Sequence, residues 1–394
     1  MPAAGADHSC LLCSDGTVVF CGYFPALALS TPEHDAEWMY TQMSSNAAQI
    51  ALLRSNGCVE VRGWGAHAIP VVRCYEPAPG SGAYVYVAAG HYEHAVLRSD
   101  GRAFLGNLSI PEVYTCLDGC TAPHQQVAQI AAGSDHTVYL LTDGTVTALG
   151  GNGVGQCDVP VLPPGLRYIQ VDAAGDGTLL LRSDGSVLYC GEILPWDHWP
   201  ELPTGVHFTQ ISLGDVHVAL LCSDGNAVAV GPNVHNCCEI PALPEGVRYV
   251  QVAAGGAHTV LLRSDGSAVA VGLNDCGQCD LPGPPIGHTF VANPTRPRCY
   301  VVQLFLELQV QANKWLVTCR DLSGASLVCW EMPPYRTSSV VRTVHGEVLH
   351  RLPSGCLLSI VLQDGTLVDS RMTWHDLFGA AETPIDDLSR FVLD

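Results

Sequence analysis

The stretch Tyr249-Val-Gln-Val-Ala-Ala-Gly-Gly-Ala-His258-Thr-Val-Leu-Leu-Arg-Ser-Asp265-Gly266 contains two apolar segments, each followed by a short turn sequence. An Asp-Gly pair next to apolar strands is a strong signal for a β-hairpin. We therefore expect a two-residue type I′ turn at Asp265-Gly266, which requires positive φ at both positions.

The same pattern occurs seven times in the first three quarters of the chain. The turn pairs are Asp15-Gly16, Asn56-Gly57, Asp100-Gly101, Asp143-Gly144, Asp184-Gly185, Asp224-Gly225 and Asp265-Gly266. Successive pairs are 40 to 44 residues apart, a period typical of a repeat built from one small antiparallel sheet. Because an open array would leave exposed strand edges, we expect a closed ring of seven four-stranded sheets.

Three motifs recur in a fixed order, namely Ala-Ala-Gly-x-x-His-Thr, Ser-Asp-Gly and Gly-x-Asn-x-x-Gly-Gln. In these motifs the chain resembles the repeats of the regulator-of-chromosome-condensation family, with seven copies over residues 1–292. The resemblance implies a mainly β protein with a seven-bladed β-propeller. Copies two and five depart most, because Gln49 replaces the histidine and residues 174–178 are one residue short.

The first copy starts at Ala3 without the Tyr-x-Gln-Val segment that precedes the other copies. A related segment follows the seventh copy at residues 288–292. We therefore expect residues 288–292 to complete the sheet begun by residues 3–22.

The motif histidines would occupy similar positions on several blades, and they are His8, His94, His136, His217 and His258. A metal ring in the channel is one reading. The interpretation we favour is structural, with each imidazole bonded to backbone groups of a neighbouring turn. The gap at Gln49 argues against a symmetric metal ring.

Eighteen cysteines are present, and most occupy repeat positions rather than ligand clusters. We expect them to be reduced and mostly buried. Cys276 and Cys279 have Cys-x-x-Cys spacing without a thioredoxin-like context. Zinc at Cys237 and Cys238, with His235 nearby, is the alternative, although adjacent cysteines lack the usual chelating spacing.

After residue 292 the period ends, and prolines mark residues 293–312 as a linker with one extra strand. We expect a hairpin at 315–320 and 326–332, a helix over 337–352, and strands at 357–362 and 366–369. This order, and residues 358–369 in particular, resemble a ubiquitin-like β-grasp fold. The predicted domains are therefore a propeller at 1–292 and a small α+β ubiquitin-like domain with a tail at 313–394.

The formal net charge of −20 disfavours direct nucleic-acid binding. The chain lacks an apolar run long enough for membrane insertion, and we expect no signal peptide because the first repeat begins at Ala3. We expect an intracellular protein, cytoplasmic or nuclear, with an organelle left open. Without convergent catalytic groups at recognisable spacing, we expect no enzyme and no cofactor.

These observations favour a non-catalytic scaffold that binds proteins, either alone or as a subunit of a larger assembly. The alternatives, which the family and tail resemblances imply, are guanine-nucleotide exchange on a small GTPase and a ubiquitin-pathway adaptor. Aromatic and acidic loop residues are the predicted partner contacts, because loops often carry function. They are Glu33, His34, Asp35, Trp38, Trp196, Asp197, His198 and Trp199.

Overall fold

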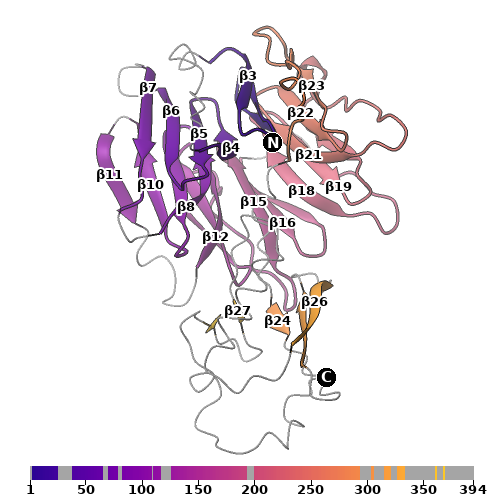
Figure 1. Cartoon of the computed structure of the whole chain (residues 1–394). Coiled ribbons are helices and arrows are strands. Elements are labelled where there is room, and N and C mark those ends of the chain that lie inside the picture. The colour runs from indigo at the N-terminus through magenta and orange to yellow at the C-terminus, as the bar shows by residue number, and fades with distance from the viewer. Residues whose placement is uncertain are drawn as a thin grey trace, which may run out of the picture. The chain divides into compact units, whose positions relative to one another are not determined.

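The computed structural model describes residues 2–24, 38–64, 70–78, 82–108, 110–116, 126–192 and 199–292, together with five strands between residues 303 and 368. The chain divides into two compact units, Met1–Arg296 and Pro297–Asp394. In the described part of the first unit, seven antiparallel sheets follow one another along the chain (Figure 1). We call these sheets blades 1 to 7.

The strands of the first three blades are β1 (Pro2–Ala4), β2 (His8–Leu12) and β3 (Val18–Gly22); β4 (Tyr40–Ser45), β5 (Gln49–Arg54), β6 (Val59–Trp64) and β7 (Pro70–Tyr75); and β8 (Tyr84–Ala89), β9 (Glu93–Arg98), β10 (Ala103–Asn107) and β11 (Ile110–Cys116). Those of the other four are β12 (Val127–Ala132), β13 (His136–Leu141) and β14 (Val146–Gly150); β15 (Tyr168–Ala174), β16 (Gly177–Arg182) and β17 (Val187–Gly191); β18 (Phe208–Leu213), β19 (Val218–Cys222) and β20 (Ala227–Val230); and β21 (Tyr249–Ala254), β22 (His258–Arg263) and β23 (Ala268–Gly272).

The expectation of four strands in every blade is wrong for several blades. Blades 2 and 3 have four strands, whereas the other blades show three within the described residues. After the third strand of blade 4 the chain forms a loop, in which the Asn152 side chain accepts a hydrogen bond from the Cys157 amide at 2.9 Å. Pro160, Pro163 and Pro164 follow, and they lack the N–H that an added strand would need. In blade 4 a loop held by side-chain hydrogen bonds therefore takes the place of a fourth strand.

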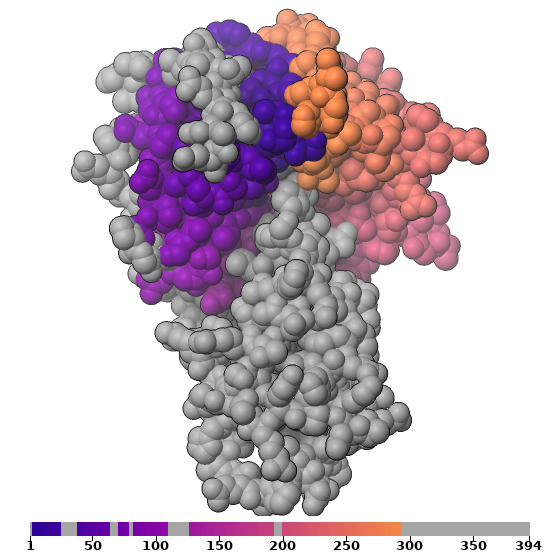
Figure 2. Space-filling view, viewed as in Figure 1, coloured from indigo at the N-terminus to yellow at the C-terminus, as the bar shows by residue number. Residues whose placement is uncertain are grey.

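The blades form a closed ring. Each blade packs against the next through its first strand, and β1 packs against β21 and β22 of blade 7. Figure 2 shows the N-terminal residues beside those near residue 280 on the surface of this unit. The family resemblance therefore predicted the number of blades and their closure correctly.

The seam of the ring lies inside blade 1. Phe290 pairs with Cys13, and the Val291 amide donates to Leu12 O at 3.0 Å. Phe290 thus takes the position that Tyr249 has opposite Arg263 in blade 7, while Pro2 continues the same line opposite Leu11. The prediction that residues 288–292 complete the first blade is confirmed.

The seven Asp-Gly and Asn-Gly turns are not type I′. In the last one, the Gly266 amide donates to Arg263 O at 3.1 Å, and the Arg263 amide donates to Ser267 O at 2.8 Å. Gly266 has φ near +80°, whereas among the described non-glycine residues only His235 and Asn236 have positive φ. This pattern fits a three-residue loop in which a type I turn precedes a left-handed glycine.

The acidic residue of each turn has a separate role. The Asp265 carboxylate accepts hydrogen bonds from the amide and hydroxyl of Ser267, at 2.9 and 2.6 Å, and Asp15 binds Thr17 in the same way. Such side-chain bonds to the backbone two residues on stabilise a turn in which the acidic residue itself keeps a negative φ. Gly16, with φ near +80°, holds the left-handed position in blade 1.

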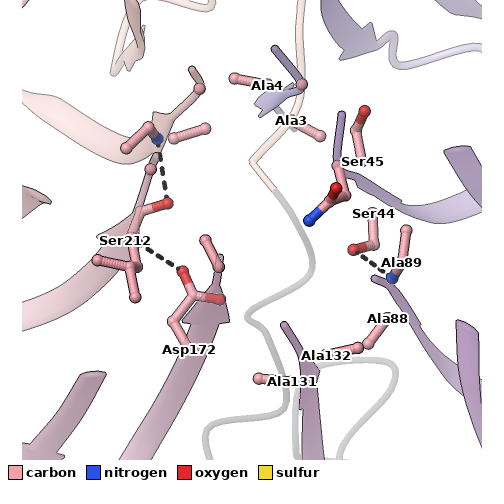
Figure 3. A pocket seen from close by; sticks show the side chains of 18 of the residues that line it. Ala3, Ala4, Ser44, Ser45, Ala88, Ala89, Ala131, Ala132, Asp172 and Ser212 are labelled. Carbon is pink, nitrogen blue, oxygen red and sulfur yellow. Dashed lines mark hydrogen bonds between the residues drawn. The ribbon is translucent and has the colours of Figure 1, made fainter. Parts of the chain in front are cut away.

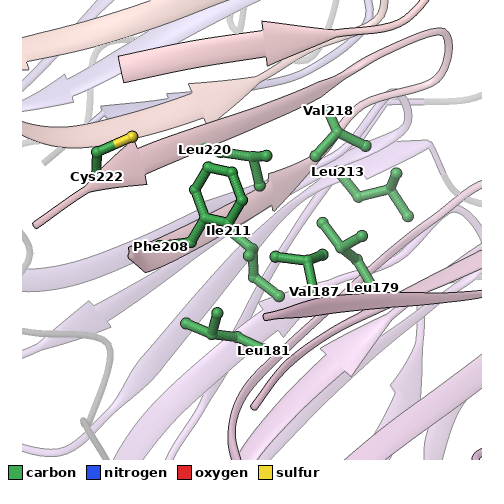
Figure 4. Close-up of a cluster of buried hydrophobic side chains, with 9 residues drawn as sticks. All are labelled: Leu179, Leu181, Val187, Phe208, Ile211, Leu213, Val218, Leu220 and Cys222. Carbon is green, nitrogen blue, oxygen red and sulfur yellow. The ribbon is translucent and has the colours of Figure 1, made fainter. Parts of the chain in front are cut away.

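Hydrophobic layers fill the spaces between blades. Leu179, Leu181 and Val187 of blade 5 pack against side chains of blade 6, among them Ile211 and Leu220 (Figure 4). These side chains are nearly inaccessible, and each contributes about 1.5–3 kcal/mol by leaving water.

Glutamines join neighbouring innermost strands. The register of β12 on β13 shifts between Val127 and Gln129, and such a bulge redirects the side chain that follows. Gln129 Nε2 donates to Val171 O at 3.0 Å, and its Oε1 accepts from the Val171 amide at 3.1 Å. Gln170 and Gln210 bind the next blade in the same way. The glutamine of the Tyr-x-Gln-Val motif therefore acts as an extra peptide group between blades.

The second unit is described only through its strands. They are β24 (Gln303–Phe305), β25 (Trp315–Arg320), β26 (Ser326–Met332), β27 (Ile360–Val361) and β28 (Leu367–Val368). β25 and β26 pair as the predicted hairpin, and β27 pairs with β28. The predicted helix at 337–352 lies outside the described residues, and the ubiquitin-like fold stays a prediction. Among the described residues, no helix is long and apolar enough to cross a membrane.

Candidate interaction face around the central channel

Seven turns, each joining the first and second strands of a blade, surround one mouth of the central channel. Backbone hydrogen bonds connect several of them in sequence, from His91 to Gly133 O, from Ser134 to Gly175 O, and from Gly256 to Gly5 O. The turns are therefore neighbours in space, although the first two of these pairs are about 40 residues apart in the chain and the third is about 250 residues apart. We call this side of the propeller the acidic face.

Carboxylates dominate the acidic face. Five of the seven turns carry one each, and these are Asp7, Glu93, Asp135, Asp176 and Asp215. All except Asp7 are exposed, and the turns contain neither lysine nor arginine. The pKa of Asp215 is raised, first because it loses hydration in the crowded mouth; His91 lowers this pKa and Asp7 raises it.

The arginines gather at the opposite ends of the strands. Arg98 and Arg182 pair with the turn residues Asp100 and Asp184, and Arg248 lies against the turn at Gly225. Asp100 and Asp184 are therefore paired with arginines within the fold. The carboxylates of the acidic face are left to attract a positively charged partner.

Small side chains line the channel itself. Figure 3 shows Ala3, Ala88 and Ala131 from separate blades around it, with Asp172 and Ser212. Asp172 Oδ2 accepts a hydrogen bond from the Leu213 amide at 2.9 Å, and Ser212 Oγ accepts one from Ala254 at 3.1 Å. The cavity volume of about 80 Å³ suits a few water molecules rather than an organic cofactor.

Three motif histidines, His136, His217 and His258, bind hydroxyl groups of the next blade just beneath this face, whereas His94 Nδ1 lies 3.1 Å from Gln49 Oε1 of the preceding blade. His217 Nε2 lies 2.7 Å from Thr259 Oγ1, which donates to Cys237 O at 2.8 Å. The hydroxyl has a single proton, so Nε2 of a neutral imidazole is the donor to Thr259. His136 with Thr178, and His258 with Ser9, form the same relay. The expected bond to a turn is thus indirect and passes through a hydroxyl.

The glycine of the Ala-Ala-Gly-x-x-His motif leaves space for the imidazole ring of the histidine. A Cβ added at Gly133 would lie 2.2 Å from His136 Cε1, and one at Gly255 would lie 2.4 Å from His258 Cε1. Real Cβ atoms do not approach other atoms this closely. The spacing of glycine and histidine therefore follows from packing.

The hydroxyl that binds a motif histidine belongs to the second strand of the next blade, at a place we call the receiving position. Where a blade lacks the motif histidine, the next blade also lacks a hydroxyl at this position. Blade 2 has Gln49 in place of the histidine, and blade 3 has Ala95 at the receiving position. Blade 5 has Gly177 instead, and blade 6 has Val218 at the receiving position. His8 is the variation, because it binds Ser45 on β4 at 2.6 Å. The histidine and its hydroxyl partner are therefore absent together at the junctions that follow blades 2 and 5.

Removing one of these hydroxyl groups should leave the two atoms that it bonds without a hydrogen-bond partner. We expect Thr259→Val to lower the free energy of unfolding by about 1–3 kcal/mol, because buried His217 Nε2 and Cys237 O lose their partner. We expect the double variant Thr259→Val/His217→Gln to lose less than the sum of the single variants, by about 1 kcal/mol. Urea unfolding of the four proteins measures this coupling, and strict additivity would contradict the relay.

The predicted partner residues are only partly described. Glu33, His34, Asp35, Trp196, Asp197 and His198 lie outside the described residues. Trp38 stacks on the Arg54 guanidinium, 3.9 Å from Cζ to the ring centroid. Trp199 packs on the core between blades 5 and 6. Their role as partner contacts stays a prediction, and both already have packing roles within the fold.

Sequence reasoning missed the residues of the acidic face. Asp7, Glu93 and Asp135 each directly precede a motif histidine. This repeated position was a usable signal. The sequence position alone does not show that these residues form one surface, because only the closed ring of blades brings their turns together around the same mouth of the channel.

The described residues contain no cluster of three or more His, Cys, Asp or Glu side chains that could hold a metal. Cys237 Sγ and Cys238 Sγ lie 3.9 Å apart and contact carbonyl oxygens of their own loop. The twelve cysteines whose side chains the structure describes, all of them in the first unit, are free thiols.

Comparisons with known proteins agree with this geometry. The pattern of the Regulator of chromosome condensation (RCC1) repeat matches residues 127–156 and 249–278. No curated protein matches the chain.

Solved structures resemble the propeller. Human WBSCR16 is 19% identical with a TM-score of 0.54, covering 66% of this chain and 85% of that one. Prp20p from Saccharomyces cerevisiae is 18% identical with a TM-score of 0.52, covering 70% and 82%. The CRINKLY WD40 ectodomain of the Arabidopsis thaliana receptor kinase ACR4 is 21% identical with a TM-score of 0.53, covering 71% and 98%. The chain therefore carries RCC1 repeats and folds as an RCC1-type β-propeller.

Proposed function

We propose that the protein is a non-catalytic interaction scaffold whose acidic face binds a basic surface of a partner protein. The observation that carries this proposal is the group of five carboxylates around the channel mouth, on turns that themselves contain neither lysine nor arginine. Rigid blades hold these groups in a fixed arrangement, which reduces the entropy that binding costs. The second unit, which we assign to a domain at 313–394 after a linker at 293–312, offers a further contact.

The structural comparisons support a binding role. The structure of Prp20p was described together with its binding to Gsp1p and to histones. An RCC1-type propeller can therefore serve as a platform for protein partners. In the present propeller the carboxylates of the acidic face support the proposal that the partner is basic.

The test compares two pairs of neutralised carboxylates. Glu93→Gln/Asp135→Asn removes two exposed charges from adjacent turns of the acidic face, and Glu201→Gln/Glu245→Gln removes two exposed charges from other loops. Purified core histones are the basic probe. We expect the first variant to bind about 3- to 10-fold more weakly, mainly through slower association at low salt, and the second to bind within about twofold of the unmodified protein.

Equal losses in both variants would mean that overall acidity, not the acidic face, attracts the probe. No loss in either would overturn the proposal. Accelerated release of labelled GDP from a small GTPase would instead favour nucleotide exchange. That assay uses the same purified proteins.

A further inference from the structure

Two pairs of thiols lie at equivalent junctions between blades. Cys21 belongs to β3 of blade 1, and Cys279 to the loop that follows blade 7. Cys190 belongs to β17 of blade 5, and Cys157 to the loop that follows blade 4. In both cases a third strand and the loop of the preceding blade supply one cysteine each.

The contacts at the first junction bring the loop against the strand. Ser9 is the register partner of Cys21, and Ser9 Oγ donates to Gln278 O at 2.8 Å. Cys21 Sγ lies 3.3 Å from the same carbonyl oxygen, and Cys279 is the next residue. A single hydroxyl relay therefore places both cysteines at the seam.

The second junction repeats this arrangement. Thr178 is the register partner of Cys190, Thr178 Oγ1 donates to Gln156 O at 2.8 Å, and Cys157 is the next residue. The two thiols of each pair are also close enough to interact electrostatically. Burial is the main cause of the raised pKa of Cys279, and Cys21 adds to it. Burial and then Asp158 raise the pKa of Cys190, and Cys157 adds to this effect.

A third junction lacks one member of the pair. Between blades 6 and 7, Thr259 donates to Cys237 O, and Cys238 follows at the position of Cys279. The register partner of Thr259 on β23 is Val271, so the strand offers no thiol. This junction is a control within the same chain.

We propose that Cys21 with Cys279, and Cys157 with Cys190, are oxidisable dithiol sites that form disulfides between adjacent blades. With glutathione disulfide as oxidant, one thiolate attacks a sulfur of the oxidant and releases one glutathione. The second thiolate then attacks the protein sulfur of the mixed disulfide and releases the other. Two protein thiols are oxidised, and one glutathione disulfide is reduced to two thiols.

The two crosslinks differ in the length of chain that they close. Cys21 and Cys279 are 258 residues apart (279 − 21), whereas Cys157 and Cys190 are 33 apart (190 − 157). A crosslink over a longer loop removes more entropy from the unfolded chain. The disulfide at the seam therefore has the larger expected effect, because it ties the first blade to the last.

The thiols are protected from rapid reaction. Burial raises the pKa of Cys21, Cys279 and Cys190 to about 11. The thiolate fraction at neutral pH is small, so we expect slow oxidation whose rate rises about tenfold per pH unit. The sites would then respond to sustained oxidising conditions rather than to a brief pulse.

The experiment uses the full chain, incubated with glutathione disulfide at pH 8.5 and then digested without reduction. We expect mass spectrometry to find the Cys21–Cys279 and Cys157–Cys190 crosslinks, and the thermal midpoint to rise by about 5 °C and to fall again after dithiothreitol. Cys279→Ser should abolish only the first crosslink and most of the shift. Cys157→Ser should abolish only the second, and Cys238→Ser should change neither.

Other products would overturn the proposal. They include glutathione bound to single cysteines without crosslinks, or Cys279 joined to the exposed Cys276 of its own loop. Cys279→Ala provides a second variant if the serine affects folding. The outcome is independent of histone binding, so this proposal and the proposed function can fail separately.

Discussion

Replacing Glu60 by alanine is expected to lower the free energy of unfolding by about 3–5 kcal/mol, because it leaves buried positive charge without a counter-charge. Glu60 is 3% exposed. Arg62 Nε lies 2.5 Å from Glu60 Oε1, and Arg54 Nη2 lies 2.5 Å from Oε2. The Tyr40 hydroxyl donates to the same carboxylate at 2.9 Å.

The charge state of this group supports the expected size. Burial alone would raise the pKa of Glu60, but Arg62, Arg54 and Tyr40 together hold it below the usual value. The carboxylate is therefore ionised at neutral pH and lies within hydrogen-bond distance of both guanidinium groups. Arg62 is almost fully buried, whereas Arg54 is partly exposed and stacks on Trp38.

Urea unfolding monitored by tryptophan fluorescence measures this loss. Glu245→Gln, on an exposed loop, is the control and should change stability by less than about 0.5 kcal/mol. The double variant Glu60→Leu/Arg62→Leu should recover part of the loss, because it removes the buried charge together with its partner. A Glu60→Ala loss below about 1 kcal/mol would show that water reaches the network.

Acidification from pH 7.5 to pH 5 is expected to destabilise the propeller by several kcal/mol. Burial lowers the pKa of His94, His217 and His258 to about 4 and that of His8 to about 3. In the unfolded chain these imidazoles titrate near 6.5. The unfolded state therefore binds more protons between pH 6.5 and about 4, and stability is complete above this window and lost as the pH falls through it.

At pH 5 each such histidine contributes a loss of about 2 kcal/mol. Thermal or urea unfolding at several pH values measures the slope, which is proportional to the number of protons taken up. His258→Gln should reduce the slope, since Gln49 shows that blade 2 accommodates glutamine at the same position. The exposed His207→Gln provides the baseline for loss of an imidazole. An unchanged slope in His258→Gln would contradict the assignment.

The ring and its seam could be predicted because they depend on repeated local signals. The Asp-Gly spacing gave the number of blades, and the missing Tyr-x-Gln-Val segment of the first copy indicated where the ring closes. The turn type could not be decided in this way, because Asp-Gly fits both a type I′ turn and a three-residue loop with a left-handed glycine. The backbone bonds that join Arg263 to Gly266 and Ser267, with positive φ at Gly266 but not at Asp265, distinguish the two.

Features that join separate blades were harder to predict. The partner of His217 is Thr259, 42 residues away, and only the assembled ring brings them together. The acidic face has the same origin, since Asp7 and Asp215 belong to distant repeats. The number of strands per blade depended on loop contacts such as that of Asn152, which a strand pattern does not contain.

The shared strand of blade 1 has a consequence for the order of events during translation. Pro2–Ala4 emerges from the ribosome almost 300 residues before Phe290 and Val291, its neighbours along the innermost strand. Until then the earliest blade lacks the start of its innermost strand. A circular permutant that joins Ala292 to Pro2, with new ends in an exposed loop, would make this strand one continuous segment and allow the blade to form as soon as it is synthesised.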